Sequence, residues 1–204
     1  MFLRAESDAE LVARTRQGDV EAFNHLVSRW EKRLYNYLLR LAGNREDALD
    51  LAQDAFLKAY QSLGTLEEAD KFPSWLYRIA HNLAFSHLRR PVPLELIEEG
   101  NQQDWSAEWP NDWKNAATPL RASAARPAFG REMELAVSSA LDALSPEQRE
   151  AIILKVYHGF RFDEIAAIIS CPVSTVKTRV YAGFMQLRAR LDTAAPAGRR
   201  AQRR

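Results

Sequence analysis

The spacing of apolar residues limits this chain to helical folds. Across residues 19–41, large apolar side chains recur at steps of three and four positions, which places them along one stripe of a helix. The stripe consists of Phe23, Leu26, Val27, Trp30, Leu34, Leu38 and Leu41. No stretch of the sequence shows the apolar–polar alternation, bounded by turn signals, that is typical of strands. The sequence therefore predicts an all-α protein.

Turn residues divide residues 1–90 into four expected helices. Gly18-Asp19 separates the first two, and Gly43-Asn44 ends the second. The third begins near Arg45 and is expected to bury Ala48, Leu51, Ala55, Phe56 and Ala59. After a polar loop over residues 64–70, the fourth runs to residue 90 and is expected to bury Trp75, Ile79, Leu83 and Leu88.

Residues 91–130 separate this block from a second helical one. They contain five of the nine prolines, carry a net charge of −3 and sustain no helical periodicity. Three tryptophans, Trp105, Trp109 and Trp113, are unusual in such a segment, because flexible linkers are generally poor in aromatic residues. We expect an acidic, flexible linker between two small domains.

The second helical block, residues 131–192, ends in a helix-turn-helix pattern. Ser145-Pro146-Glu147-Gln148 starts a helix that reaches His158-Gly159. A short helix over residues 163–169, a turn over 170–172 and a final helix over 174–191 follow. This arrangement is typical of proteins that place the last helix in the DNA major groove. An ordinary helical hairpin with a solvated face is the alternative. The basic tail, residues 193–204, is expected to be disordered.

Two faces are expected on the final helix. Val176, Val180, Leu187 and Leu191 fall on the inward one. The outer face carries hydroxyls and cations, which contact phosphates and guanine edges in DNA. Its members are Ser174, Thr175, Lys177, Thr178, Tyr181 and Arg188.

A row of carboxylates lies on the third expected helix. Asp47, Asp50 and Asp54 are three and four positions apart, so they share one face, with Gln53 beside them. Such a row is a solvated face, a metal site or a docking surface for a basic partner. No second element offers converging metal ligands.

The sequence offers no constellation for catalysis. It contains no phosphate-binding glycine loop, nucleophile elbow or zinc-ligand spacing, and the four histidines are scattered. We therefore expect neither an enzyme nor a bound metal or cofactor. The single cysteine, Cys171, fits a reducing compartment. No apolar run is long enough to span a membrane, and the N-terminus is too charged for a signal peptide, which favours the cytoplasm.

Two separated segments resemble bacterial sigma factors of the extracytoplasmic-function (ECF) group. The first covers residues 46–63 and 72–90, and the second covers residues 141–180. The resemblance implies a sigma region 2-like four-helix domain over residues 1–90 and a sigma region 4-like helix-turn-helix domain over residues 131–192. It implies an alternative sigma factor that binds core RNA polymerase and directs promoter-specific initiation. The implied partners are the clamp helices of the largest polymerase subunit, the flap of the second subunit, promoter DNA and an anti-sigma factor.

The resemblance also implies three groups of binding residues. Those for polymerase are Asp47, Asp50, Gln53 and Asp54. Those for the −10 element are Lys71, Phe72, Trp75, Arg78, Asn82, Arg89 and Arg90. Those for the −35 element are Ser174, Thr175, Lys177, Thr178, Arg179, Tyr181 and Arg188.

The chain departs from the family pattern after Tyr181. Members of the family usually continue with a basic run, often Arg-Ala-Arg, whereas this chain has Ala182-Gly183-Phe184. Fewer cations predict weaker phosphate contact at the −35 element. This departure keeps one alternative open, a sigma-like decoy that sequesters an anti-sigma factor. The other alternative is a helix-turn-helix regulator that acts without polymerase, and the acidic face of the third helix distinguishes a sigma factor from it.

Overall fold

The first half of the molecule is a bundle of four helices. A computed structural model describes residues 6–88 and 131–194, and within these ranges all regular structure is helical. The elements of the first half are α1 (Asp8–Arg16), α2 (Val20–Ala42), α3 (Arg45–Ser62), the 3-10 turns η1 (Leu63–Thr65) and η2 (Ala69–Lys71), and α4 (Phe72–Leu88). The all-α prediction is confirmed for the described residues.

The predicted breaks between these helices are confirmed by their capping contacts. Asp19 accepts a hydrogen bond from the backbone N–H of Ala22 at the start of α2. Gly43 ends α2 with φ +78°, a left-handed conformation that glycine adopts without steric cost. Asn44 then accepts from the backbone N–H of Asp47 and caps α3. Short polar residues thus fix where each helix begins and ends.

The predicted buried face is right for α3 and shifted for α4. All five apolar residues expected to be buried on α3 are buried. On α4 the buried residues are Phe72, Leu76, Tyr77, Ala80 and Ala84. The residues expected there, Trp75, Ile79 and Leu83, are half-buried, and Leu88 is 45% exposed. The reason is that α4 packs against α2 and α3 on one side and against α7 on another. The residues between these contacts are the most buried, and they are not the ones with the largest apolar side chains.

The second half contains α5 (Arg131–Asp142), α6 (Pro146–Ile152), a π-helical segment η5 (Ile153–Tyr157), α7 (Phe162–Ile168) and α8 (Val173–Ala194). The predicted capping box is confirmed: Ser145 accepts from the N–H of Gln148, whose side chain accepts from the N–H of Ser145. The expected helix from Pro146 to Tyr157 is correct in extent, but its last turn widens to π geometry. Gly159 follows with φ +74°.

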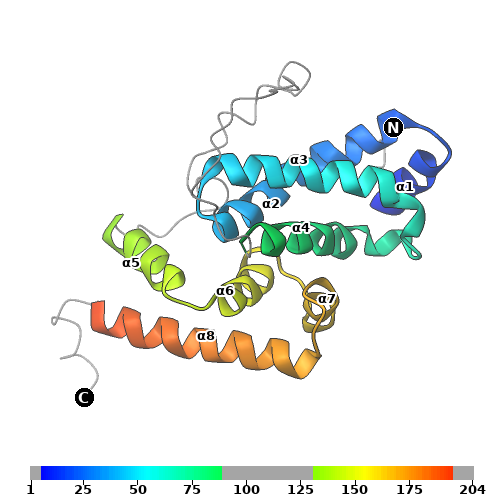
Figure 1. Cartoon of the computed structure of the whole chain (residues 1–204). Coiled ribbons are helices and arrows are strands. Elements are labelled where there is room, and N and C mark those ends of the chain that lie inside the picture. Colours follow the sequence, from blue (N-terminus) through cyan, green and yellow to red (C-terminus); the bar gives the residue numbers. More distant parts are fainter. Residues whose placement is uncertain (1–5, 89–130, 195–204) are drawn as a thin grey trace, which may run out of the picture.

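The two halves pack against each other. Figure 1 shows α1 to α4 above α5 to α8, with α6 and α7 directly beneath α4. Contacts join α4 to α7 and α2 to α6, and buried residues of both halves form one continuous core. The expected linker with its three tryptophans lies outside the described residues.

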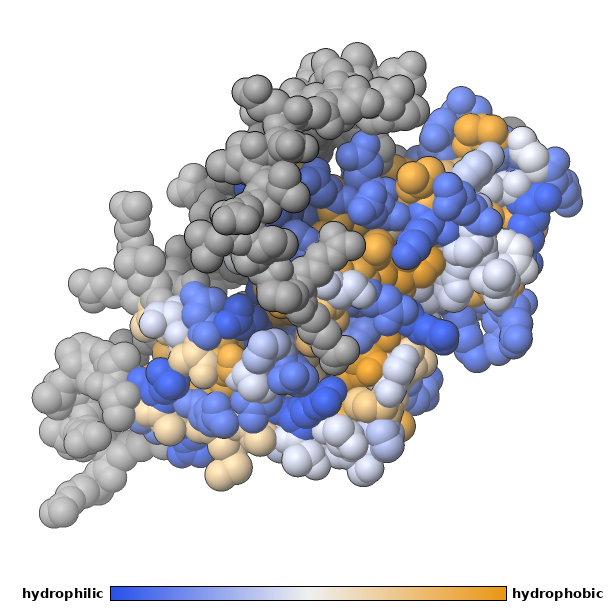
Figure 2. All heavy atoms as spheres, in the orientation of Figure 1, coloured by the Kyte–Doolittle hydropathy of each residue, from blue (hydrophilic) through white to orange (hydrophobic). Residues whose placement is uncertain are grey.

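The outer surface mixes polar and apolar side chains. Figure 2 shows a largely hydrophilic face on which apolar side chains are exposed in separate patches. None of the described helices is both long enough and apolar enough to cross a bilayer.

Candidate functional site

The acidic row of α3 faces solvent. Asp50, Gln53 and Asp54 are exposed and lie at steps of three and four on one helix face. Partial desolvation, together with the nearby charges of Asp54 and Asp47, raises the pKa of Asp50 above its usual value. This carboxyl therefore sits among like charges, which favours an approaching cation.

Asp47 differs from the other carboxylates of this row. It is half-buried, accepts a hydrogen bond from the side chain of Asn44, and lies 3.1 Å from His87 Nε2. The Asn44 contact, followed by the His87 contact, lowers the pKa of Asp47. Asp47 thus helps to start α3 and ties it to α4, so it is less available to a partner than Asp50 and Asp54.

Two apolar side chains extend the acidic row, and the sequence analysis missed them. Leu57 is 56% exposed and Tyr60 is 43% exposed, on the same face of α3 as Asp50 and Asp54. The Tyr60 ring also packs edge-on against Phe23 of α2, with 4.9 Å between centroids. Their helical spacing from Asp50 and Gln53 was the available signal. The result is a surface of carboxylates that continues into large apolar groups.

The residues expected at the −10 element divide into exposed and buried groups. Arg78 and Asn82 of α4 are exposed, and exposed Lys71 pairs with Glu68 at 2.6 Å. Trp75 is half-buried, with its ring 6.1 Å from that of Phe72. Phe72 itself is fully buried, which contradicts its expected exposure to DNA, because it anchors the start of α4 in the core. Arg89 and Arg90 lie outside the described residues.

The helix-turn-helix is present as α7 and α8. Val176 and Val180 are buried against the rest of the half, and Leu187 and Leu191 are half-buried, so the expected inward face is confirmed. The exposed residues of the opposite face are Ser174, Lys177, Thr178, Tyr181 and Arg188. Thr175 and Arg179 are half-buried. The outward residues are those that the sequence assigned to DNA.

A basic pocket adjoins this face and was not expected from the sequence. It has a volume of about 540 Å³ and is lined by Lys155, Arg161, Phe162, Asp163, Val173 and Lys177. The ammonium groups of Lys155 and Lys177 lie 4.7 Å and 5.9 Å from the centre of the Phe162 ring. The tertiary structure brings these cations together from η5, the start of α7 and α8.

Gly183 lies where α8 crosses α6. A Cβ atom at this position would lie 2.6 Å from Ile152 Cδ1, because α8 crosses α6 closely here. The neighbouring side chains Phe184 and Met185 are 43% and 74% exposed. The departure from the family pattern therefore combines a close helix crossing with an apolar outer surface.

Comparisons with known proteins identify the family. The model of sigma-70 region 2 matches residues 26–91, and that of sigma-70 region 4 matches residues 134–187. The RNA polymerase sigma-H factor of Pseudomonas aeruginosa is 33% identical over 88% of this chain and 91% of its own length. The chain belongs to the ECF sigma factor family. It is an alternative sigma factor that directs transcription, and sigma factors are not enzymes.

A relative named as an ECF sigma factor and two solved structures match over similar lengths. The sigma-E factor of Escherichia coli strain K12 is 33% identical over 86% of this chain and 89% of its own length. The structure of RpoE from Bartonella quintana with the anti-sigma factor NepR has a TM-score of 0.60 and 25% identity, covering 83% of this chain and 96% of that one. CnrH in complex with the cytosolic domain of CnrY has a TM-score of 0.65 and 22% identity, covering 93% and 100%, which supports the fold.

Proposed function

We propose that the exposed face of α3 docks on the basic clamp helices of the largest polymerase subunit. The observation that carries this proposal is the row of Asp50, Gln53 and Asp54, which continues into exposed Leu57 and Tyr60. Carboxylates orient a basic partner and increase its association rate, whereas desolvated apolar groups provide more of the affinity. Asp47 acts here mainly by fixing the start of α3.

The −10 element is assigned to the loop over residues 64–71 and to the exposed side of α4. Lys71, Arg78 and Asn82 offer cations and an amide to a single strand, and half-buried Trp75 offers a ring edge. Phe72 supports this surface from within the core. Arg89 and Arg90 stay in the proposal on the basis of the family resemblance alone.

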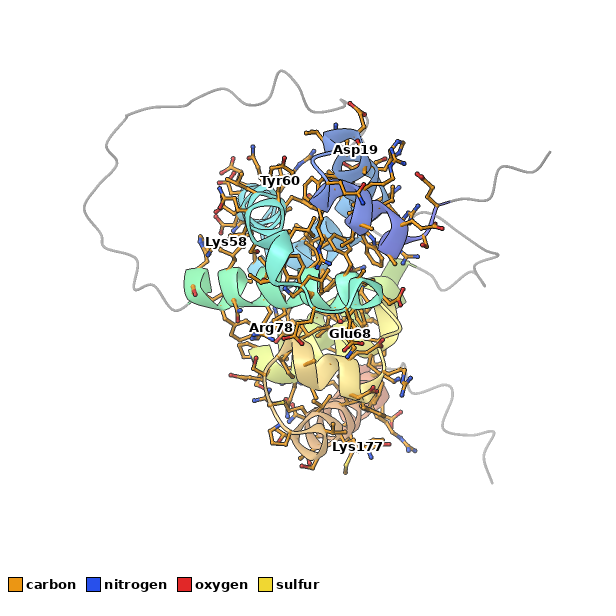
Figure 3. The ribbon with its side chains drawn as sticks, turned by 90° about the vertical axis from the view of Figure 1, so that its right-hand side faces the viewer. Asp19, Lys58, Tyr60, Glu68, Arg78 and Lys177 are labelled. Atoms are coloured by element: carbon orange, nitrogen blue, oxygen red, sulfur yellow. The ribbon has the colours of Figure 1, made fainter. Side chains whose placement is uncertain are left out.

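The −35 element is assigned to the outer face of α8, with Lys177, Thr178 and Tyr181 nearest the groove. Ser174 and Arg188 extend this face along the helix, and half-buried Thr175 and Arg179 flank it. Lys155 and Arg161 of the basic pocket add phosphate contacts, because both line the same hollow as Lys177. Figure 3 shows Lys58 and Tyr60 on α3 at one end of the molecule and Lys177 at the other. Polymerase and duplex DNA would therefore meet opposite sides of the folded molecule.

The proposed domain division follows these assignments. Residues 1–90 carry polymerase and −10 binding, residues 131–192 carry −35 binding and contact the flap of the second polymerase subunit, and residues 91–130 connect them. An anti-sigma factor is proposed as the inhibitor, since the RpoE structure is a complex with one. The site of action is then the cytoplasm, where polymerase and DNA are found.

Run-off transcription tests the docking face. Core RNA polymerase, the protein and a pool of host promoter fragments are compared for the wild type and for Asp50→Arg with Asp54→Arg. We expect specific transcripts from the wild type and at least a roughly hundredfold loss in the variant, because two like charges would meet the clamp. Glu21→Arg with Glu147→Arg is the control, since it makes the same charge change at exposed sites elsewhere.

Binding to core polymerase is measured in parallel. Loss of core binding by the Asp50→Arg, Asp54→Arg variant alone supports the proposed face. Equal loss in the control variant would show a general charge effect and contradict it. A wild-type protein that does not bind core polymerase would favour a regulator that acts without it. Core binding with no transcripts from any promoter would favour the sigma-like decoy.

A further inference from the structure

The interface between the two halves contains a buried carboxylate. Glu150 of α6 is 1% exposed, although acidic side chains are rarely buried without a partner. Tyr37 of α2 donates its hydroxyl to Glu150, and His81 Nδ1 of α4 lies 2.7 Å from the same carboxylate oxygen. Both partners belong to the first half of the molecule. The buried carboxyl group therefore has its hydrogen-bond partners across the interface and depends on the two halves staying together.

Aromatic side chains also join the two halves, next to the Glu150 partner Tyr37. The Tyr77 hydroxyl of α4 lies 2.8 Å from His158 Nδ1, and the Tyr77 ring packs 4.9 Å from the ring of Phe160. The Tyr37 ring contacts His158 at 5.8 Å between centroids. Each of these contacts joins the first half to the second. The interface thus combines specific polar partners with packed rings, unlike an incidental contact between two surfaces.

This packing holds the two expected DNA-binding helices close together. Helix α7 packs against both α4 and α8. The axes of packed helices lie about 8–10 Å apart, so α4 and the adjoining end of α8 are separated by roughly 20 Å. In Figure 1, α7 lies between α4 and the end of α8 that begins at Val173.

A promoter requires a much larger separation. Elements named for positions −10 and −35 lie about 25 base pairs apart, which is roughly 85 Å along B-form DNA. The packed arrangement cannot contact both elements at once. Residues 89–130 join the described parts of the two halves, and a chain of this length reaches up to roughly 140 Å when extended. The connecting chain is therefore long enough for the halves to reach both elements.

We propose that the Glu150–His81–Tyr37 cluster is an intramolecular latch that keeps the free sigma factor closed and unable to engage a promoter. Polymerase binding would capture the opened form and shift the equilibrium toward it. This proposal rests on the proposed function, in which α4 and α8 read separate promoter elements. Glu150 would then control availability of both DNA-binding surfaces without touching DNA.

Small-angle X-ray scattering of the full-length free protein tests the latch. Glu150→Lys places a cation against His81, and His81→Glu places a second carboxylate against Glu150. Each is expected to raise the radius of gyration by roughly a third, because two compact halves would separate on their connecting chain. Combining the two substitutions places opposite charges at the same two positions and should return the radius to the wild-type value. The control is Glu147→Lys, an exposed site on the same helix, which should change nothing.

Circular dichroism separates opening from unfolding. The single variants should keep the wild-type helix signal while the radius grows. Single variants that stay as compact as the wild type would overturn the latch. Loss of helix in both single variants and in the combined variant would also overturn it, because the cluster would then be part of the folding core.

Association with core polymerase tests the regulatory part. If opening limits binding, Glu150→Lys should associate roughly tenfold faster than the wild type, since a closed population no longer has to open. An expanded variant that associates no faster would overturn the regulatory role. If neither protein binds core polymerase, the proposed function fails, while the scattering result still decides whether the cluster holds the halves together.

Discussion

Carboxylates occupy two contrasting regions of this sigma factor. Those on α3, Asp50 and Asp54, are exposed and are not covered by any described part of the chain, whereas Glu150 is buried between the halves with Tyr37 and His81. An exposed carboxylate adds little to stability and remains available to a partner. A buried one costs several kcal/mol to desolvate, and its partners must offset that cost. The same chemical group therefore serves recognition in one region and domain packing in the other.

The contrast predicts where substitutions change binding and where they change packing. Substitutions on exposed faces should alter affinity for polymerase or DNA with little effect on the folded state. Substitutions at the interface should alter the packing of the halves first. Three measurements, ordered by expected effect, test this division.

The largest effect on stability is expected when low pH protonates His158. Burial, followed by the charges of Arg40 and Arg33, lowers the pKa of His158 to about 4 from an ordinary value of 6.5. The folded form therefore keeps His158 neutral, and the stability that depends on this is complete above pH 6.5 and lost as pH falls toward 4. Between pH 7.5 and 5 we expect a loss of about 2 kcal/mol in the free energy of unfolding, measured by urea titration.

Two variants show whether this pH dependence belongs to the interface. His158→Leu should abolish most of it, whereas His25→Leu, at an exposed position on α2, should leave it intact. The groups around His158 are Arg33, Arg40, Tyr37 and Tyr77, so the positive charges already present oppose its protonation. An unchanged pH dependence in His158→Leu would assign the acid sensitivity to other groups.

A smaller effect is expected from removing one hydroxyl at the interface. Tyr37→Phe deletes the hydrogen bond to Glu150 and should lower the free energy of unfolding by about 1.5 kcal/mol, because hydrogen bonds to charged groups are stronger than neutral ones. Tyr35→Phe is the matched control, since the buried Tyr35 hydroxyl has no hydrogen-bond partner among the described residues. Equal losses in the two variants would mean that the Glu150 contact contributes nothing specific.

The smallest effect is expected on the exposed face of α8. Phe184→Arg adds a cation near the proposed DNA surface and should raise affinity for duplex DNA of arbitrary sequence roughly threefold at low salt, with a salt slope steeper by about 0.9. Gln186→Arg adds the same charge about 200° around the helix and should have less effect. Fluorescence anisotropy across a salt series provides the measurement. Equal gains would point to a general charge effect and would remove Phe184 from the DNA-facing side.

Local patterns were enough to predict much of the fold. The breaks at Gly18-Asp19 and Gly43-Asn44, the start at Ser145 and the stop near Gly159 depend on capping and turn chemistry within a few residues. The buried face of α3 could be predicted from the sequence, because its apolar residues form one stripe and that stripe is the side that packs against the other helices. The buried face of α4 could not be predicted in this way. Because α4 packs on two sides, its most buried face includes Tyr77 and leaves Trp75 half-buried.

The candidate sites show the same division. The exposure of Asp50, Asp54, Lys177 and Tyr181 was correctly expected, since helical spacing alone separates outward positions from inward ones. The interior position of Phe72 was missed, because an aromatic residue at the start of a helix fits either DNA contact or the core.

The sequence by itself determined the helices, their ends and the polar faces, because these depend on interactions between residues less than about five positions apart. Only the tertiary structure decided that Tyr37, His81 and Glu150 meet, since Tyr37 lies 113 positions and His81 69 positions from Glu150, and all three come from different helices. Histidines that look scattered along the chain become members of one interface in this way. Burial then changes what each group does: a carboxylate that would be an exposed docking group on α3 becomes, on α6, a buried link between the two halves of the molecule.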